Sequence, residues 1–309
     1  MTELTLGTMT FGGRAPKAAA LEVVQRARDL GVTRFDTANM YESGRSELIL
    51  GEAVRPFRNH VQIATKVGAG RLGKASEGLS KARVLASCEE SLGRLGTDRV
   101  DLFYLHMPDP SVPYEETLGA LGLLLASGKI LSWGVSNHAS WQIVELYAVA
   151  KSLGLPPPAR AQQLYNALVR QLDVEYFAFA KKYALATEVY NPLAGGLLTP
   201  RHASPSAAKK GSRFDKNGLY ERRYWSPVLF SRRDDLARVA EKHGLSLVEL
   251  SYAFLATKAG VDGVVVGPAE IAHLDAAASG LAKPLSTEIA HEIDSLHHAW
   301  KGTDARYAR

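Results

Sequence analysis

Four side chains between residues 36 and 106 have the types needed to protonate an oxygen atom together: Asp36, Tyr41, Lys66 and His106. A phenol has an ordinary pKa of about 10, and a nearby ammonium favours the phenolate and lowers that pKa. A partly buried lysine needs a carboxylate to stay charged, so Asp36 is assigned to Lys66. Tyr41 is then the predicted acid. A neutral His106 holds a carbonyl oxygen in line by hydrogen bonding.

Other reaction classes lack their characteristic residues. We find no nucleophile beside a base and no cluster of histidine, cysteine and carboxylates with metal-ligand spacing, so no metal site is predicted. The single cysteine, Cys88, lies in a helical pattern and is predicted to be a buried packing residue. One cysteine excludes an internal disulfide and fits a reducing compartment.

Composition and charge narrow the class of protein. The 309 residues are 46% hydrophobic and 22% charged, which is typical of a globular protein with a large core. The net charge of +5 is spread along the chain, so no nucleic-acid partner is predicted. The N-terminus has no secretion signal and no apolar run is long enough for a bilayer, so we expect a cytoplasmic protein without membrane contact.

Short apolar runs alternate with amphipathic stretches along the chain. The stretches "KAAALEVVQRARDLG", "SKARVLASCEESLGRLG", "SWQIVELYAVAKSLG" and "SLVELSYAFLATKAG" repeat apolar residues at helical spacing and end near glycines. Eight strands that each lead into a helix predict an α/β fold, a (β/α)8 TIM barrel covering residues 1–309 as one domain. The predicted strands are 4–8, 33–36, 61–66, 100–106, 130–136, 159–164, 185–190 and 262–267.

The unusual polar residues all map to the carboxyl ends of these predicted strands, the rim where barrel enzymes assemble their sites. Besides the four residues above, this group comprises Ser136, Asn137, Gln162 and Tyr190. Each has an ordinary structural explanation when taken singly. Their coincidence on one rim predicts an active site.

The segment 191–231 interrupts the alternation after the seventh strand. About forty residues separate that strand from the next clear helical pattern, and they include "GSRFDKNGLYERRYWSP". A long irregular loop within a compact domain is disordered or functional, and the aromatic residues argue against disorder. We expect a lid or a substrate wall.

The chain resembles the aldo-keto reductases over nearly its whole length, in "LGTMTFGG", "RFDTANMYESGRSE", "ATKVG", "LFYLHMPD", "GKILSWGVSN", "QQLYN" and "YNPLAGGLLTP". The resemblance implies that Asp36, Tyr41, Lys66 and His106 correspond to the family's catalytic tetrad. The resemblance implies NADPH-dependent reduction of a small-molecule aldehyde or ketone, with Tyr41 donating the proton. It implies cofactor binding by Thr8, Met9, Ser136, Asn137, Gln162, Tyr190, Asn191, Pro192, Leu193, Gly195, Gly196, Leu197, Arg213, Gly267 and His273.

Within this family the chain is most similar to the aflatoxin-aldehyde and succinic-semialdehyde reductase branch, through "LHMPD", "SNHASWQIVEL" and "YERRYW". That branch implies that Tyr220 and Arg223 bind an acidic end of the substrate beside Tyr41 and His106. It also implies a monomer or a homodimer.

One region departs from the family pattern. The segment "VVGPAEIAHLDAAASG" has Ala269 and Glu270 where the family has serines, His273 where it has Gln or Arg, Asp275 for a Glu and Ala277 for an Asn. These positions hold the adenosine 2′-phosphate and adenine in relatives. NADP(H) remains the expected cofactor and NAD(H) the alternative, with Arg213 as a substitute cation.

Two other functions fit the same residues. A dedicated biosynthetic reductase of a keto-sugar, polyketide or imine would use the same tetrad with a loop 191–231 shaped for a bulky ligand. A non-enzymatic, cofactor-binding regulatory subunit would keep the cofactor residues, as channel-associated members of the superfamily do.

Overall fold

Eight parallel strands close into a barrel, as the sequence predicts. The computed structural model describes residues 2–73, 75–202, 204–205 and 208–303. Neighbouring strands pair in the cyclic order β1-β10-β9-β8-β7-β6-β3-β2. Their bounds are β1 Glu3–Gly7, β2 Arg34–Asp36, β3 Gln62–Val67, β6 Leu102–Leu105, β7 Trp133–Ser136, β8 Arg160–Leu164, β9 Ala186–Tyr190 and β10 Gly263–Val266.

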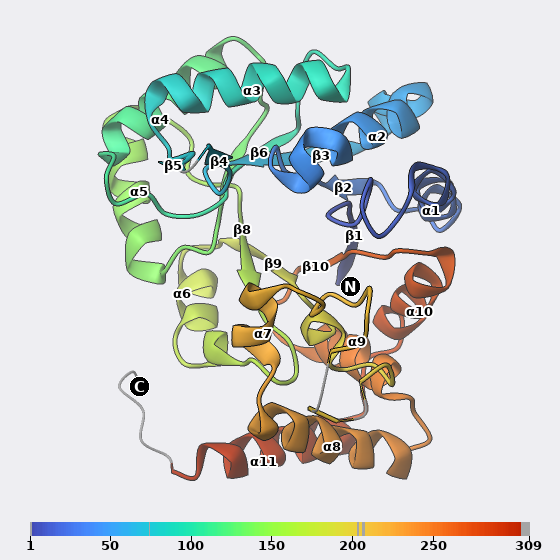
Figure 1. Cartoon of the computed structure of the whole chain (residues 1–309). Coiled ribbons are helices and arrows are strands. Elements are labelled where there is room, and N and C mark those ends of the chain that lie inside the picture. The colour runs from blue at the N-terminus through green and yellow to red at the C-terminus, as the bar shows by residue number, and fades with distance from the viewer. Residues whose placement is uncertain (1, 74, 203, 206–207, 304–309) are drawn as a thin grey trace.

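Helices form a ring around the strands (Figure 1). The α-helices are α1 Lys17–Asp29, α2 Arg45–Val54, α3 Lys81–Leu95, α4 Tyr114–Ala126, α5 Ser140–Ser152, α6 Tyr176–Lys182, α7 Gly218–Tyr224, α8 Pro227–Lys242, α9 Leu247–Thr257, α10 Ile271–Leu281 and α11 Thr287–Lys301. Short 3-10 helices are η1 Tyr41–Gly44, η2 Arg55–His60, η3 Gln171–Asp173 and η4 Ala194–Gly196. None of the helices in the described part of the chain has the length and apolar character needed to cross a membrane.

Helix α3 illustrates how the sequence sets these elements. The Ser80 hydroxyl accepts a hydrogen bond from the Arg83 amide at the start, and Gly96 ends the helix in the left-handed region at φ 63°. Cys88 lies on the buried face and is a free thiol, which confirms its predicted packing role. Burial raises the pKa of this thiol to about 12, so it stays protonated and unreactive at neutral pH.

The segment 191–231 is more ordered than the sequence suggested. It contains η4, the whole of α7 and the start of α8 at Pro227, so the expectation of forty irregular residues before the next helix is wrong. The Asn217 side chain accepts a hydrogen bond from the Tyr220 amide and caps α7, and Tyr220 and Tyr224 are buried against the barrel. The helix is only two turns long, too short for its periodicity to stand out in the sequence.

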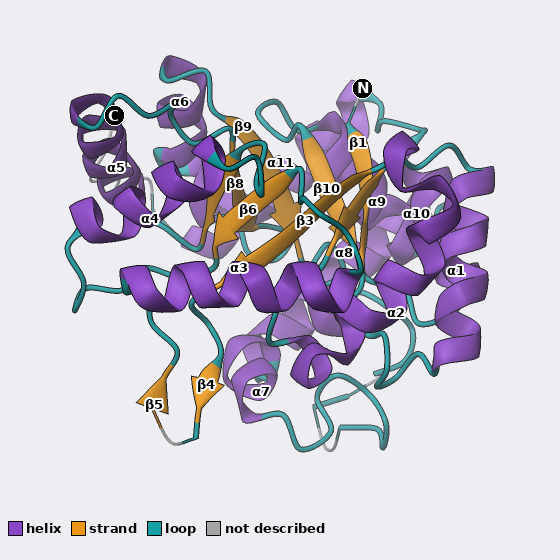
Figure 2. Ribbon diagram, turned by 90° about the horizontal axis from the view of Figure 1, so that it is seen from above, coloured by secondary structure: helices purple, strands orange, loops and turns teal. Residues whose placement is uncertain are grey.

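A small hairpin, β4 Arg71–Leu72 paired with β5 Ala75–Ser76, follows β3 and was not predicted. It projects on the same side of the strands as α7 (Figure 2). The buried Glu77 fixes its base, because one carboxylate oxygen accepts from the amides of Gly68 and Gly70. The other oxygen accepts from the Asn39 side chain and so ties the hairpin to the loop after β2.

Candidate active site

The loop between β2 and α2 places Tyr41 at the carboxyl end of the barrel. The Asn39 amide donates to the Lys66 carbonyl, and its side chain donates to Ser87 on α3 at 2.8 Å. Glu42, Ser43 and Gly44 follow with φ of 48°, 57° and 88°. Left-handed backbone at two non-glycine residues costs energy and persists only where the surroundings enforce it. The loop therefore holds the phenol in one place.

Lys66 lies buried beneath Tyr41 and pairs with Asp36. Its side chain is 0% exposed and that of Asp36 is 2% exposed, so the two charges share a site without water. The ammonium donates to Asp36 Oδ1 and, at 2.7 Å, to the Thr37 carbonyl. Two of its three hydrogens are used, and the nitrogen lies 5.2 Å from the centre of the Tyr41 ring. The structure thus brings the predicted acid, cation and carboxylate together.

The expected lowering of the Tyr41 pKa is wrong for this structure. Burial raises the pKa of the phenol and is the largest influence, while the charge of Lys66 lowers it by a smaller amount. Asp36, the partner of Lys66, also raises it because a second negative charge nearby disfavours the phenolate. The net effect keeps Tyr41 protonated, which is the form that an acid needs before it donates.

His106 faces Tyr41 across the mouth of the site. The two rings meet edge to face, with centroids 6.0 Å apart. Burial, with a smaller contribution from the Lys66 charge, lowers the pKa of His106 to about 3, so the ring is neutral at physiological pH. Its Nδ1 is buried and has no hydrogen-bond partner among the described residues. The neutral histidine of the prediction is therefore present, and one ring nitrogen lacks a protein partner.

A second polar group lies beside the tetrad at the ends of β7, β8 and β9. Asn137 Nδ2 donates to the His106 carbonyl at 2.9 Å and to Ser136 Oγ at 3.0 Å. The Tyr190 hydroxyl donates to Asn137 Oδ1. Gln162 Nε2 donates to Asp36 Oδ2 at 2.8 Å. All four residues line one pocket that also contains Asp36, Tyr41 and His106.

That pocket has a volume of about 1120 Å³, larger than most sites for single drug-sized ligands. It runs from the tetrad past the segment after β9 to helices α9 and α10. Such a cavity has room for an extended ligand and a small molecule together. Of the residues predicted to bind a cofactor, the following line it: Met9, Ser136, Asn137, Gln162, Tyr190, Asn191, Pro192, Leu193, Gly195, Gly196, Arg213, Gly267 and His273.

Two predicted cofactor residues lie outside the pocket lining. Thr8 is fully buried, and its hydroxyl hydrogen-bonds to Ser46 at 2.7 Å and to the Asp36 carbonyl. Leu197 is fully buried in a hydrophobic cluster with Phe214 and Tyr224. Both side chains support the walls of the pocket and are not available to a ligand.

Gly195 shows why the turn after β9 needs a glycine. Its φ is 70°, and a Cβ atom there would lie 2.8 Å from the Tyr220 ring. Any other residue would push Tyr220 away from the turn and strain the backbone. Gly196 follows with φ 107°, and both glycines present backbone to the pocket.

Tyr220 and Arg223 both line the pocket, but their surroundings differ. The Tyr220 hydroxyl accepts from Arg213 Nη1 at 2.9 Å and donates to Asn191 Oδ1 at 3.2 Å, so it is occupied by the protein. The Arg223 guanidinium lies over the Tyr220 ring, 5.9 Å from its centre. Among the described residues, Arg223 forms no ion pair with a carboxylate within 4 Å. Arg223 is thus the better placed of the two to meet an acidic ligand.

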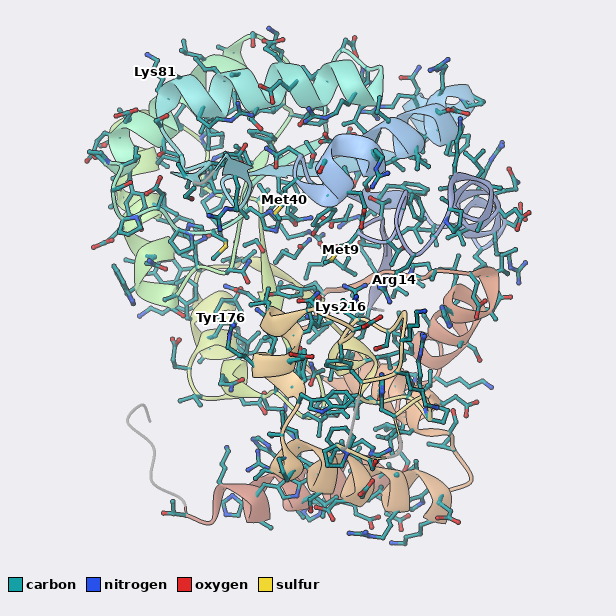
Figure 3. The ribbon with its side chains drawn as sticks, in the orientation of Figure 1. Met9, Arg14, Met40, Lys81, Tyr176 and Lys216 are labelled. Atoms are coloured by element: carbon teal, nitrogen blue, oxygen red, sulfur yellow. The ribbon has the colours of Figure 1, made fainter. Side chains whose placement is uncertain are left out.

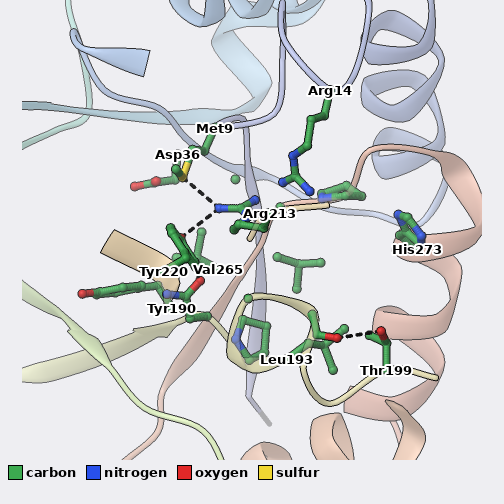
Figure 4. A pocket seen from close by; sticks show the side chains of 18 of the residues that line it. Met9, Arg14, Asp36, Tyr190, Leu193, Thr199, Arg213, Tyr220, Val265 and His273 are labelled. Carbon is green, nitrogen blue, oxygen red and sulfur yellow. Dashed lines mark hydrogen bonds between the residues drawn. The ribbon is translucent and has the colours of Figure 1, made fainter. Parts of the chain in front are cut away.

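Sequence reasoning missed Arg14 in the loop after β1. Figure 4 shows Arg14 and Arg213 extending toward the same part of the pocket, and Arg213 also donates to the Met9 sulfur at 3.1 Å. Burial and the like charge of Arg213 lower the pKa of Arg14 to about 10. Two cations side by side favour an anion between them. No motif marks Arg14, so only the fold could reveal it.

Sequence reasoning also missed the apolar walls at the mouth. Met9, Met40, Met107 and Leu219 line the pocket and are 37 to 53% exposed. Met9 and Met40 lie near the middle of the ring of helices (Figure 3). Three of the chain's four methionines thus face one cavity, and thioether side chains adapt readily to different apolar ligands.

At the far end of the pocket the departures from the family pattern have structural counterparts. His273 Nε2 lies 3.2 Å from Glu270 Oε1, and both side chains are more than half exposed. Asp275 instead forms an ion pair with Arg26 of α1 at 2.7 Å, so its carboxylate is turned away from the pocket. No group of residues suited to a metal ion is found in the described part of the chain.

Comparison with known proteins identifies the family. Residues 3–298 match the model of the Aldo/keto reductase family. An aldo-keto reductase of Pseudocercospora fijiensis is 31% identical over 280 residues, 87% of this chain and 93% of that protein. A probable voltage-gated potassium channel subunit beta of Arabidopsis thaliana is 32% identical over 84% of this chain and 80% of its own.

A further relative comes from the branch that the motifs suggested. Aflatoxin B1 aldehyde reductase member 2 of Homo sapiens is 40% identical over 228 residues, 71% of this chain and 62% of that protein. The family model spans nearly the whole barrel, and the resemblance inferred from the motifs is confirmed. The chain belongs to the aldo/keto reductase family of oxidoreductases.

Proposed function

We propose that this protein reduces an aldehyde or ketone to the alcohol with NADPH as the reductant. The observation that carries the proposal is the arrangement around Tyr41, where a protonated phenol lies between a buried, paired ammonium and a neutral histidine. This arrangement stands at the wall of a pocket large enough for both reactants.

The chain's own residues deliver the proton. Tyr41 donates it to the carbonyl oxygen as negative charge develops there. Lys66 stabilises the phenolate that remains, and Asp36 keeps Lys66 charged and in place. His106 orients the carbonyl oxygen, because a neutral imidazole that lines the pocket can donate a hydrogen bond without adding charge.

The polar groups beside the tetrad fit a carboxamide such as that of nicotinamide. Its oxygen needs a donor, which the Ser136 hydroxyl supplies since its oxygen already accepts from Asn137. Its amide hydrogens need an acceptor, and the Gln162 carbonyl oxygen is available because Gln162 Nε2 faces Asp36. Tyr190 offers a ring face for stacking. When bound, the reduced nicotinamide supplies the hydride to the carbonyl carbon.

The remaining lining residues suit the phosphates of a dinucleotide. The turn 191–196 presents the backbone of Gly195 and Gly196 to the pocket. Arg213 and Arg14 add positive charge nearby, and Gly267 and His273 also line the pocket. Because the carboxylate of Glu270 lies 3.2 Å from His273, the two arginines are the better candidates to recognise the 2′-phosphate.

The substrate side of the pocket suits an apolar carbonyl compound with an acidic group. Met40, Met107 and Leu219 form its apolar walls, and Arg223 offers a guanidinium from α7. The segment 191–231 therefore acts as a substrate wall in this proposal, with α7 as its rigid part.

The direct test measures oxidation of NADPH by a panel of aldehydes and ketones. We expect turnover with at least the reactive aromatic aldehydes and none without a carbonyl compound. A second candidate, a cofactor-binding regulatory subunit, is favoured by the similarity to the potassium channel subunit. Tight NADPH binding without turnover across the panel would support that candidate and contradict reduction.

A further inference from the structure

Glu188 is a buried carboxylate that none of the roles above uses. It lies on β9 inside the barrel, below the tetrad, and is 3% exposed. In the sheet its register partners are Gln162 on β8 and Gly263 on β10. A buried carboxylate is costly unless it is paired and hydrogen-bonded, so its partners indicate what it does.

Donors from three strands converge on Glu188. Its Oε1 accepts from the Thr5 hydroxyl on β1, and Arg160 Nη1 lies 3.9 Å from the same oxygen. Its Oε2 accepts from Gln162 Nε2 at 2.9 Å and from the Tyr104 hydroxyl at 3.4 Å. A Cβ at Gly263 would lie 3.2 Å from Arg160 Nη1 and 3.5 Å from Glu188, so the glycine leaves room for this pair.

Glu188 and Asp36 share the amide of Gln162. Its Nε2 donates to Glu188 at 2.9 Å and to Asp36 at 2.8 Å, so both hydrogens are used. Two carboxylates on one side fix which end of the amide is nitrogen. The carbonyl oxygen is thereby held on the opposite end of the amide, and Gln162 lines the pocket.

We propose that Glu188 is a positioning residue for the reduction. It fixes Gln162 so that the carbonyl oxygen meets the carboxamide of the cofactor, and its charge supports the Lys66 ammonium through the shared network. This inference rests on the proposed function. It adds a second carboxylate to the site, one that touches neither the substrate nor Tyr41.

The electrostatics of Lys66 agree with this role. Burial lowers the pKa of Lys66, but Asp36, Tyr41 and Glu188 raise it, and the net shift is upward. The other titratable groups facing this part of the barrel are Tyr104, His106 and Arg160. Removing the charge of Glu188 leaves Lys66 easier to deprotonate, which moves the alkaline limit of activity to lower pH.

Two substitutions separate the hydrogen bond from the charge. Glu188→Gln removes the charge but keeps an oxygen that accepts from Gln162, whereas Glu188→Leu removes both. For Glu188→Leu we expect the dissociation constant of NADPH, titrated by fluorescence without a carbonyl compound, to rise about tenfold. For Glu188→Gln we expect that constant to change less than twofold, while the alkaline limb of kcat/KM moves down by about half a pH unit or more.

Tyr104→Phe is the matched control, because it deletes another partner of Glu188 Oε2 and leaves Gln162 untouched. We expect it to keep both the NADPH affinity and the alkaline limb. Circular dichroism melts show whether each variant is folded. If Glu188→Leu does not fold, the pH profile of Glu188→Gln decides alone.

The outcomes separate this inference from the proposed function. A wild-type protein that reduces no carbonyl compound contradicts the proposed function, whether or not it binds NADPH. If the wild type is active and Glu188→Gln has the same alkaline limb of kcat/KM as the wild type, only the positioning role is overturned. The same holds if folded Glu188→Leu binds NADPH as tightly as the wild type.

Discussion

The two ends of the pocket are built differently. At the tetrad, Lys66 and Asp36 are 0% and 2% exposed and each makes several hydrogen bonds. At the end near α10, the side chains of His273 and Glu270 are 56% and 65% exposed and contact each other, and His273 also accepts a long hydrogen bond from the Ala269 amide. The first end is fixed before any ligand arrives, whereas charges at the second are free to rearrange around one.

This difference matches the tasks we propose for the two ends. Proton transfer depends on distances held to fractions of an ångström, and buried, fully bonded groups keep them. Recognition of a phosphate depends mainly on charge, which exposed side chains can supply with less exact placement. Substitutions at the tetrad should therefore affect turnover strongly, and those at the other end should affect affinity moderately.

The largest effect is expected for Tyr41→Phe. Losing the acid should lower kcat by roughly 10²- to 10⁴-fold, the usual contribution of general acid catalysis. NADPH affinity should stay nearly unchanged because the pocket keeps its shape. Tyr252→Phe is the matched control, since Tyr252 lines the other end of the same pocket. A Tyr41→Phe variant with most of its turnover intact would remove the assignment of Tyr41 as the acid.

The lowered pKa of His106 predicts that the stability of the folded protein changes with pH. Its folded pKa of about 3 lies below the unfolded value of about 6.5, so only the unfolded chain takes up the proton between these values. The folded state therefore loses stability as pH falls below about 6.5. From pH 7 to pH 5 this costs about 2 kcal/mol in the free energy of unfolding. Urea unfolding of His106→Asn should lack that part of the decrease, and an identical decrease in both proteins would contradict a neutral His106.

The substitutions Arg14→Ala and Arg213→Ala test recognition of the 2′-phosphate at the end of the pocket away from the tetrad. We expect each to raise the dissociation constant of NADPH about tenfold and that of NADH clearly less, because only NADPH carries the 2′-phosphate. Raising the salt concentration should reduce the difference. Equal losses for both cofactors would place the two arginines on the pyrophosphate.

The smallest effect is expected for Arg223→Ala. It should raise KM several-fold for carboxylate-bearing aldehydes and little for neutral ones, because only the former lose a charged partner. Arg222→Ala is the matched control, since Arg222 is the exposed neighbour on the same helix. Equal changes in KM for both classes of aldehyde would contradict a contact between Arg223 and a substrate carboxylate.

The sequence predicted the barrel well because the fold follows from local patterns, and it also predicted that Asp36, Tyr41, Lys66 and His106 lie together at one end of it. All eight predicted barrel strands are present, and Asp36, Ser136 and Tyr190 end their strands as expected. The sequence alone could not show which side chains that are far apart along the chain come into contact in the folded barrel. Arg14 and Glu188 carry no motif, and they acquire a role only when the barrel closes and β1 comes to lie beside β10.

The predicted lowering of the Tyr41 pKa was wrong for a related reason. Sequence spacing indicated a cation near the phenol, but the extent of burial depends on the whole fold, and burial has the larger influence. Helix α7 was missed because two turns give too little periodicity, although the aromatic residues that bury it were recognised.

The methionines at the mouth have a consequence for oxidative conditions. Met9, Met40 and Met107 are exposed enough to meet peroxide, whereas the lone cysteine is sealed in the core. Oxidation would turn the thioethers into polar sulfoxides, which bind apolar compounds poorly until methionine sulfoxide reductases restore them. Peroxide damage in this protein should thus begin at the entrance used by substrates, while the buried acid and its supporting charges stay intact.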